Sequence, residues 1–226
     1  MASPKELNLL AHDEAALRPE APDLTATGSF AKHDDPRLPV LGDQNGNGDG
    51  APATAGATAP SSLVHEHGLR HALVEVMVVS PNRRVLLRRR RKDDEVAPDT
   101  FDVSASAHLL PGDHGDALAA AKRALAEAGL DADRLTLKPL SGEPERHRLE
   151  FPVGAAIENV EVHCFQAEGE AGEAGAAGGN GTPPPDGAER VWLDADDARR
   201  MLSEDPAVCS PFLAAGMKRW FGGAAA

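Results

Sequence analysis

The stretch SASAHLLPGDHGDALAAAKRALAEAGL (104–130) contains residue types suited to phosphate chemistry. A small-residue turn and a His lead into a Pro-Gly-Asp loop, and an Ala-rich segment that ends at Gly129 follows. Backbone amides of such a loop can bind phosphate oxygens. Carboxylates for a hard divalent cation are scarce, because the segment 117–128 contains a single acid, Glu127. The stretch therefore indicates one of two alternatives: a metal-dependent phosphate site, or a fold that has the loop and helix of such a site but lacks its catalytic carboxylates.

A basic run, RRRRK (88–92), provides candidate groups for an anionic substrate. The planar guanidinium group of Arg matches two phosphate oxygens at once. Alternate residues of a strand point to opposite faces, so about half of the run can reach one cleft. We predict that Arg89 and Lys92 bind substrate. The competing interpretation is a solvated strand end, offset by the acidic run DDE (93–95).

The overall composition excludes several classes of function. A net charge of −13 over 226 residues opposes broad binding to nucleic acid, because phosphate backbones attract basic surfaces. Cys164 and Cys209 lie far apart and show neither metal-ligand spacing nor a disulfide framework. No apolar run approaches the roughly 18–20 residues of a membrane span, and the N-terminal acids do not suit a targeting peptide. We therefore expect a cytoplasmic protein that binds neither nucleic acid polymers nor membranes.

The chain length suits one domain with appendages. We expect an acidic, poorly ordered tail over 1–37, one domain over 38–221 and a short tail over 222–226. Two Ala-, Gly- and Pro-rich stretches, at about 44–60 and 169–187, interrupt the domain and predict flexible surface insertions.

Hydrophobic patterns within the domain predict strands interspersed with helices. ALVEVMVVS is rich in β-branched residues, and the turn PNRR joins it to VLLRRRR as a hairpin. Asp116 suits the N-cap of a helix that ends before Gly129, with Leu118, Ala121 and Leu125 on one face. The predicted strands are a short one that opens LPVLGDQNGNGDG (38–50), then 72–80, 85–91, 101–106, 157–168 and 189–194, and the predicted helices are 116–128, 194–205 and 210–221. This pattern predicts an α+β (mixed α/β) sandwich.

The order of these elements and several local motifs resemble the Nudix superfamily, in particular its isopentenyl-diphosphate-isomerase-like branch. VHEHGLRHALVEVMVV is similar to that branch's VH..GL.HRAV strand, VLLRRRR to its LLLQRR strand and PDTFDVSASAHLLPGD to its PG.WDVS..GH...GE segment. ERVWLD and SPFLAAGMKRWF are similar to its last strand and helix. The resemblance covers roughly 38–221 apart from the insertions. It implies a Nudix-type α/β/α sandwich with a curved mixed sheet, and Mg²⁺- or Mn²⁺-dependent chemistry on a small diphosphate-containing molecule.

The box that defines this family, GX5EX7REUXEEXGU, is degenerate in this sequence. Its first Glu matches Asp113, and with Arg123 as the box Arg, two of its three clustered carboxylates are replaced by Ala124 and Ala128. The resemblance implies that Glu127 is a metal ligand and the catalytic residue, that Asp113 is a further ligand, and that Arg123 contacts substrate. One Glu does not readily hold a metal and act as general base as well. The competing interpretation is an Ala-rich packing helix with one solvent-facing Glu.

The isomerase-like branch also holds a metal through histidines, and the matching places in this chain are His65, His71 and His108. Its strand-borne acids match the region of Glu158 and Glu161. Imidazole combined with carboxylate suits Mn²⁺ or Zn²⁺, so the resemblance implies a second metal-binding set in these five residues. The competing interpretation is that HEH (65–67) is a polar loop before a strand and that His108 caps a turn.

Isomerase activity itself is not expected, because Ser106 replaces the Cys that the resemblance implies for protonation, and a hydroxyl is far less acidic than a thiol. The leading hypothesis is weak, divalent-metal-dependent hydrolysis of a small diphosphate-linked compound. The alternative is a catalytically inactive fold that serves as a binding or regulatory module. The alanines at 124 and 128 favour the alternative, and the His–Glu set favours the enzyme. The substrate and the oligomeric state stay open.

Overall fold

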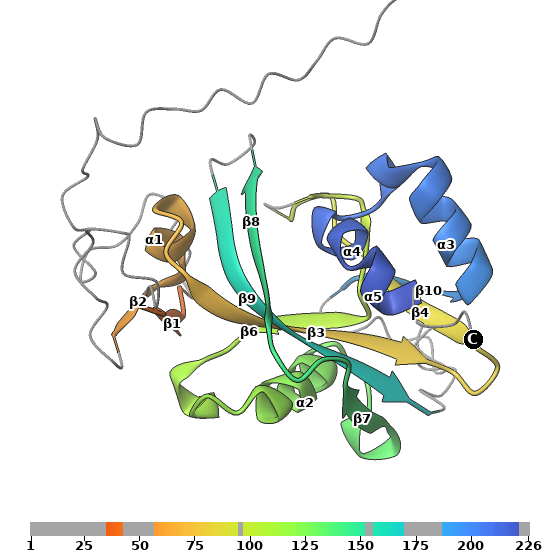
Figure 1. Cartoon of the computed structure of the whole chain (residues 1–226), viewed down its shortest axis with the longest axis horizontal. Helices are drawn as coiled ribbons and strands as arrows, with labels where there is room; N and C mark the ends of the chain where they lie inside the picture. Colours follow the sequence, from red (N-terminus) through yellow and green to blue (C-terminus); the bar gives the residue numbers. More distant parts are fainter. Residues whose placement is uncertain (1–34, 43–56, 95–96, 152–155, 170–186, 222–226) are drawn as a thin grey trace, which may run out of the picture.

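The computed structural model describes residues 35–42, 57–94, 97–151, 156–169 and 187–221. These residues form an eight-stranded sheet and a separate two-stranded sheet. Helices cover both faces of the larger sheet, which is curved and twisted (Figure 1). The predicted fold class, an α+β sandwich around a mixed sheet, is therefore confirmed.

Two long strands at the centre of the larger sheet, β3 (His71–Val79) and β9 (Ala156–Glu168), run parallel to each other. The other pairings in the described part of this sheet are antiparallel. They involve β4 (Arg84–Arg89), β5 (Phe101–Asp102), β6 (Ala105–His108), β7 (Thr136–Pro139), β8 (Glu145–Phe151) and β10 (Glu189–Asp194). The path across the sheet is β10-β4-β3-β9-β7, with β5 on β4, β6 on β3 and β8 on β9.

The two faces of the sheet pack against different helices because strand side chains alternate in direction. On β3, Val74, Val76 and Val78 pack against α2 (Ala117–Glu127). Met77 points to the other face, where α3 (Ala195–Glu204), α4 (Pro211–Ala215) and α5 (Met217–Phe221) form a second core (Figure 1). The odd-numbered residues of β3 therefore face α3–α5 and the even-numbered ones face α2.

Helix α2 forms where the sequence predicts it. The Asp116 carboxylate accepts hydrogen bonds from the N–H groups of Leu118 and Ala119, as an N-cap does. Gly129 follows the helix with φ at 72°, a conformation that favours glycine. The prediction that Leu118 shares the buried face of Leu125 is wrong, because Leu118 is 42% exposed. It lies in the first turn of α2, before the buried residues begin at Ala120.

Some elements differ from the predictions. Strands β7 and β8 occupy a region for which no element was predicted, and the predicted helix over 210–221 is divided at Gly216 into α4 and α5. The last residues of the predicted insertion at 44–60 form β2 (Thr58–Pro60), which pairs with β1 (Arg37–Pro39) and buries Ala59 completely. Residues 44–56 of that insertion, the tail up to residue 34, and residues 170–186 and 222–226 lie outside the described residues. The predicted domain boundaries therefore stay predictions.

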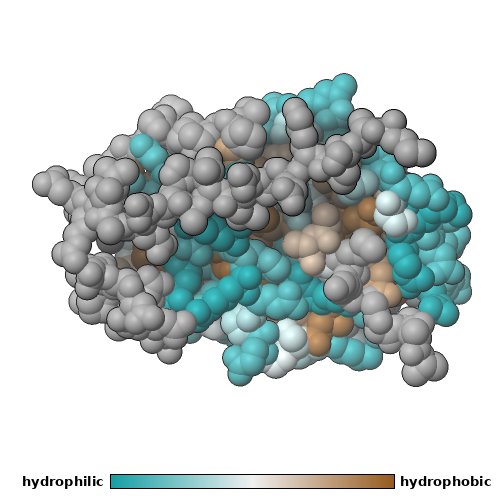
Figure 2. Space-filling model, turned by 45° about the horizontal axis from the view of Figure 1, so that its top comes forward, coloured by the Kyte–Doolittle hydropathy of each residue, from teal (hydrophilic) through white to brown (hydrophobic). Residues whose placement is uncertain are grey.

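No helix in the described part of the chain has the length and apolar character needed to span a membrane. Hydrophilic residues cover most of the described surface on the face shown in Figure 2, and hydrophobic residues form only small patches there. Leu118 is the large hydrophobic residue that is exposed among the described residues.

Candidate metal centre

Four side chains able to ligate a metal converge at one end of the sheet. His65 comes from α1 (Ser61–Glu66), His71 from β3, His108 from β6 and Glu158 from β9, and one ligand atom of each lies within 4.8 Å of all the others. His65 Nε2 lies 3.4 Å from His108 Nε2 and 3.5 Å from Glu158 Oε1, and His71 Nε2 lies 3.3 Å from Glu158 Oε2. Ligand atoms held roughly 2.1 Å from a tetrahedral ion are about 3.4 Å apart. The spacing therefore suits one divalent ion.

Strand register accounts for this convergence. Leu73 lies opposite His108 in the β3–β6 pair, and His71 lies opposite Val160 in the β3–β9 pair. Glu158 precedes Val160 by two residues and so points to the same side of the sheet. All three ligands that come from strands therefore lie on the face opposite α2.

The turn between α1 and β3 ties His65 to the strand that carries Glu158. Gly68 has φ at 59°, and its carbonyl oxygen accepts a 3.0 Å hydrogen bond from Asn159 Nδ2. A Cβ atom added to Gly68 would lie 2.8 Å from Ile157 Cγ2. The turn thus packs against the residues on both sides of Glu158 and requires glycine.

Hydrogen bonding prepares His71 to act as a ligand. Its Nδ1 lies 2.9 Å from the carbonyl oxygen of Leu69. Because a carbonyl oxygen only accepts, Nδ1 carries the proton of the neutral ring and Nε2 presents its lone pair to the cluster. A metal-bound His is commonly oriented in this way by its second nitrogen.

The cluster holds buried polar atoms that protein groups leave unsatisfied. Among the described residues, neither His71 Nε2 nor Glu158 Oε2 has a hydrogen-bond partner of suitable geometry, although the two are 3.3 Å apart. His71 is fully buried and Glu158 is 5% exposed. Buried polar groups are normally satisfied, so unsatisfied ones in a cluster call for an explanation such as a bound ion. The residues present therefore fit a divalent cation.

Electrostatics keep the ligands in the forms that bind metal. The pKa of His108 is lowered to about 3, first by burial and then by His71, His65 and Arg123, against the opposing effect of Glu158. Burial alone would raise the pKa of Glu158, but its contact with His71 and the neighbouring His65 and His108 outweigh burial and bring that pKa to about 2. At neutral pH the site thus presents a neutral imidazole at His108 and an ionised carboxylate.

A cavity of about 340 Å³ adjoins the cluster and includes His65, His108 and Glu158 in its wall. Leu73 and Phe212 provide an apolar stretch of wall, and a polar section follows beyond them. The residues of that section are Glu75, Arg88, Arg90, Asp102 and Ser106, with Arg91, Asp93 and Asp94 also on the lining. The cavity thus joins a metal-type site to a set of cationic side chains.

The predicted box residues Asp113, Arg123 and Glu127 lie outside the four-residue cluster and form hydrogen bonds with one another and with the backbone. Asp113 Oδ2 accepts hydrogen bonds from Leu110 N and Arg123 Nη2, at 2.7 and 2.8 Å. Arg123 also donates to the carbonyl oxygen of His108 at 2.7 Å and to Glu127 at 3.0 Å. The Glu127 side chain is 57% exposed. Neither acid belongs to the four-residue cluster, so the structure links both to the site only through Arg123 and the His108 backbone.

The two alanines that replace box carboxylates face the core. Ala124 is 2% exposed and Ala128 is 5% exposed, and both pack in the cluster that α2 forms with Val74 and Val76. This face of the sheet is opposite the metal-type site. The interpretation of α2 as a packing helix with one solvent-facing Glu therefore describes the structure.

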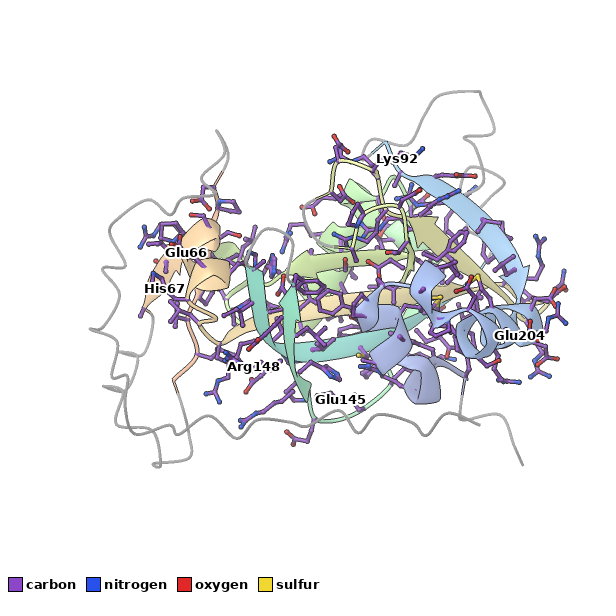
Figure 3. All side chains as sticks on the ribbon, turned by 90° about the horizontal axis from the view of Figure 1, so that it is seen from above. Glu66, His67, Lys92, Glu145, Arg148 and Glu204 are labelled. Carbon is purple, nitrogen blue, oxygen red and sulfur yellow. The ribbon has the colours of Figure 1, made fainter. Side chains whose placement is uncertain are left out.

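Three other predicted residues are not brought to the cluster or cavity. Glu161 is three residues from Glu158 and so points to the other face of β9, where it pairs with Arg70 and Arg146. Arg89 is 42% exposed and pairs with Asp99. Lys92 is exposed on the loop after β4, at the margin of the molecule in Figure 3. Arg88, the arginine of β4 that lines the cavity, has the opposite strand parity to Arg89; Arg90 and Arg91, which follow the strand, line the cavity as well.

Glu75 is the site residue that sequence reasoning missed. It lies at the centre of β3, is 2% exposed and lines the cavity. An acid inside the apolar run ALVEVMVV is the signal that could have identified it, since Glu is almost never fully buried without a partner.

A partly buried cluster of three His and one Glu beside an arginine-lined cavity, on a mixed sheet between helices, is a site of the metal-binding class. The chain is similar in structure to DR0079 from Deinococcus radiodurans, with a TM-score of 0.55 and 13% identity over 82% of this chain and 99% of that one. It is also similar to RenU, a Nudix hydrolase from M. smegmatis (TM-score 0.40, 17% identity, 80% of this chain and 90% of that one). A NUDIX hydrolase from Nitrosomonas europaea gives a TM-score of 0.44 at 12% identity, over 68% of this chain and 90% of that one.

No protein-family model and no curated protein matches the sequence. At these identities the structural similarity concerns the fold alone.

Proposed function

We propose that this chain is a Nudix-type protein that binds a divalent cation through His65, His71, His108 and Glu158, and hydrolyses a small diphosphate-linked compound in the adjoining cavity. The observation that carries the proposal is the convergence of these four side chains within 4.8 Å, with two buried ligand atoms that lack hydrogen-bond partners among the described residues. Of the two metal-binding sets that the resemblance implies, we thus assign the metal to the histidine set and not to Asp113 and Glu127.

The donor set favours Mn²⁺ over Mg²⁺ as the cation. Three imidazoles with one carboxylate suit borderline metals, whereas Mg²⁺ prefers oxygen ligands in octahedral geometry. When bound, such a cation stabilises negative charge on phosphate oxygens and lowers the pKa of a coordinated water. Zn²⁺ fits the same donors, so the titration of both ions decides the identity of the metal.

Residues of the cavity supply the remaining functions. Arg88 and Arg90 lie on its wall and can neutralise charge on a phosphate group. Leu73 and Phe212 give the cavity an apolar stretch that limits water at the reacting group. The side chain of His65 is 19% exposed and lies between the cluster and solvent. Glu127, the predicted catalytic residue, lies outside this cavity and has no part in this scheme.

A second candidate function is a catalytically inactive binding module. The observation that favours it is the burial of Ala124 and Ala128, which leaves α2 without the carboxylates of the family box.

Isomerase-like activity stays disfavoured. Ser106 lines the cavity, and neither cysteine does; burial also raises the pKa of the Cys164 thiol to about 12. The cytoplasmic location and the absence of nucleic acid partners stay predictions.

The proposal is tested by phosphate release from ADP and from isopentenyl diphosphate, with and without added Mn²⁺. We expect Mn²⁺-dependent release by the parent protein and a loss on the order of 10² or more in His108→Ala, since one lost electrostatic contact commonly costs that much. Glu204→Gln is the control, because Glu204 lies on α3 at the end of the molecule away from Glu66 and His67 (Figure 3). Release that is independent of metal, or equal in parent and His108→Ala, would contradict the proposal. Metal binding without release from either compound would support the binding module.

A further inference from the structure

A buried carboxyl group with no assigned role lies on the wall of the cavity. Glu75 stands opposite Ser106 in the β3–β6 pair and opposite Cys164 in the β3–β9 pair. Residues directly opposite in a sheet point to the same face, so Glu75 and Ser106 line the cavity together. Glu75 Oε2 is buried and has no hydrogen-bond partner among the described residues. A ligand in the cavity would provide the missing partner.

The cationic part of the same wall also has an unsatisfied atom. Arg88 Nη2 donates to Asp102 Oδ2 at 3.1 Å and lies 3.4 Å from Ser106 Oγ, while Arg88 Nε is buried and has no hydrogen-bond partner in the described part of the chain. Arg90 Nη1 donates to the same Asp102 oxygen at 2.9 Å. Asp102 thus holds both guanidinium groups on the cavity wall that Glu75 also lines.

The charge of this wall depends on Glu75. Burial would raise the pKa of Asp102, but Arg88, Arg90 and the hydrogen bond from Ser210 lower it, so Asp102 is ionised. Arg88, Arg90 and Asp102 together carry one net positive charge, and an ionised Glu75 would cancel it; Arg90 also lies 3.8 Å from Asp94, whose charge Arg91 balances. Farther out, Arg91 pairs with Asp93 and Asp94. The Asp93 side chain is 77% exposed, so solvent screens its charge.

Groups around Glu75 keep it neutral. The pKa of Glu75 is raised to about 8, first by burial and then by Asp102 and Glu145, against the opposing effect of Arg219. Arg219 is itself close to Glu145, at 3.4 Å, and donates to the Cys164 thiol on the β9 side. Arg88, on β4, and Arg90, just after the end of that strand, are both paired with Asp102. The neighbouring cations are thus paired with Asp102 or Glu145, and the effect of Arg219 on the pKa of Glu75 does not outweigh burial and Asp102.

We propose that Glu75, in its neutral form, donates a hydrogen bond to an anionic group bound at Arg88 and Arg90, and that the subsite rejects the anion once Glu75 is ionised. A carboxylic acid donates one hydrogen bond, whereas a carboxylate only accepts. Ionisation therefore removes a donor and adds a repelling charge inside a buried site. Glu75 is a specificity-determining residue for an anion such as the terminal phosphate of a diphosphate. The inference rests on the proposed function only in assuming that the cavity takes an anionic ligand.

The experiment is a calorimetric titration of the protein with inorganic diphosphate at pH 7 and at pH 9, for the parent and for Glu75→Gln. The affinity of the parent should follow the neutral fraction of Glu75 and weaken roughly tenfold between these two values. Glu75→Gln, which stays neutral and keeps an N–H donor, should bind at both pH values and lack this loss. Titration of diphosphate itself affects both proteins equally. Glu204→Gln should follow the parent.

Two outcomes would overturn the inference: parallel pH dependence in parent and Glu75→Gln, or no binding of diphosphate by the parent at pH 7. If Glu75→Gln does not fold, the infrared carbonyl band of the protonated carboxyl group is followed in the parent at pH 7. That band should shift when diphosphate binds, and an unshifted band with diphosphate bound would overturn the inference. A separate titration with Mn²⁺ alone tests the metal cluster, so failure of the proposed function and failure of this subsite are distinguished.

Discussion

Helix α2 offers the sharpest perturbation, because restoring the family carboxylate at position 124 should damage the protein. Ala124 is 2% exposed and packs against Val74 and Val76. A neutral carboxyl group buried there without a partner costs roughly 2–7 kcal/mol, and the added volume costs about 1–3 kcal/mol more. We expect Ala124→Glu to lower the free energy of unfolding by at least about 3 kcal/mol.

The matched control is Ala126→Glu, which makes the same substitution on the same helix at an exposed position. Its free energy of unfolding should stay within about 0.5 kcal/mol of the parent value. Both variants are compared with the parent by urea unfolding, with linear extrapolation to water. If Ala124→Glu is as stable as Ala126→Glu and binds Mn²⁺ more tightly than the parent, α2 faces a metal site and the argument from burial is refuted.

Two further predictions concern single acids. Glu127→Ala should change stability by less than about 1 kcal/mol and leave the Mn²⁺ affinity unchanged, because Glu127 makes an exposed pair with Arg123; a large loss of affinity in a Mn²⁺ titration would return the metal to α2. Glu75→Gln should change how stability depends on pH. The folded-state pKa of about 8 lies above the ordinary 4.5, so the stability that Glu75 contributes is complete below pH 4.5 and is lost as pH rises through about 8. At about 1.4 kcal/mol per pH unit the limit is about 5 kcal/mol. Urea unfolding at pH 5 and pH 8.5 should show the parent losing a few kcal/mol relative to the variant, and parallel changes would contradict a neutral Glu75.

The local patterns of the chain predicted much of the fold. The β-branched run ending at Val79 specified β3, and Asp116 with Gly129 specified both ends of α2. Strand β8 was missed because its sequence ERHRLEF is mostly charged, and its alternation leaves only every second residue half-buried. Gly216 divides the last helix, which the amphipathic pattern did not indicate.

Sequence identified candidate residue types for the site, but strand parity decided which of them meet. Glu158 and Glu161 differ by an odd number of residues, so one strand cannot direct both to the same face. By the same alternation, Arg88 and Arg89 point to opposite faces of β4. Only the pairing of β4 with β5 and β10 determines which of the two side chains faces the cavity. Glu75 became a site residue through burial and the nearness of Asp102, which depend on strands far apart in sequence.

The central claim is that the metal site lies at the histidine cluster. Calorimetric titration with Mn²⁺ of the parent, Glu158→Gln and Glu161→Gln tests it most directly, because the two variants change the same residue type on opposite faces of β9. We expect one Mn²⁺ per chain in the parent, with the affinity weakened at least tenfold in Glu158→Gln and nearly unchanged in Glu161→Gln. No binding by the parent, or equal effects of the two substitutions in folded proteins, would contradict it.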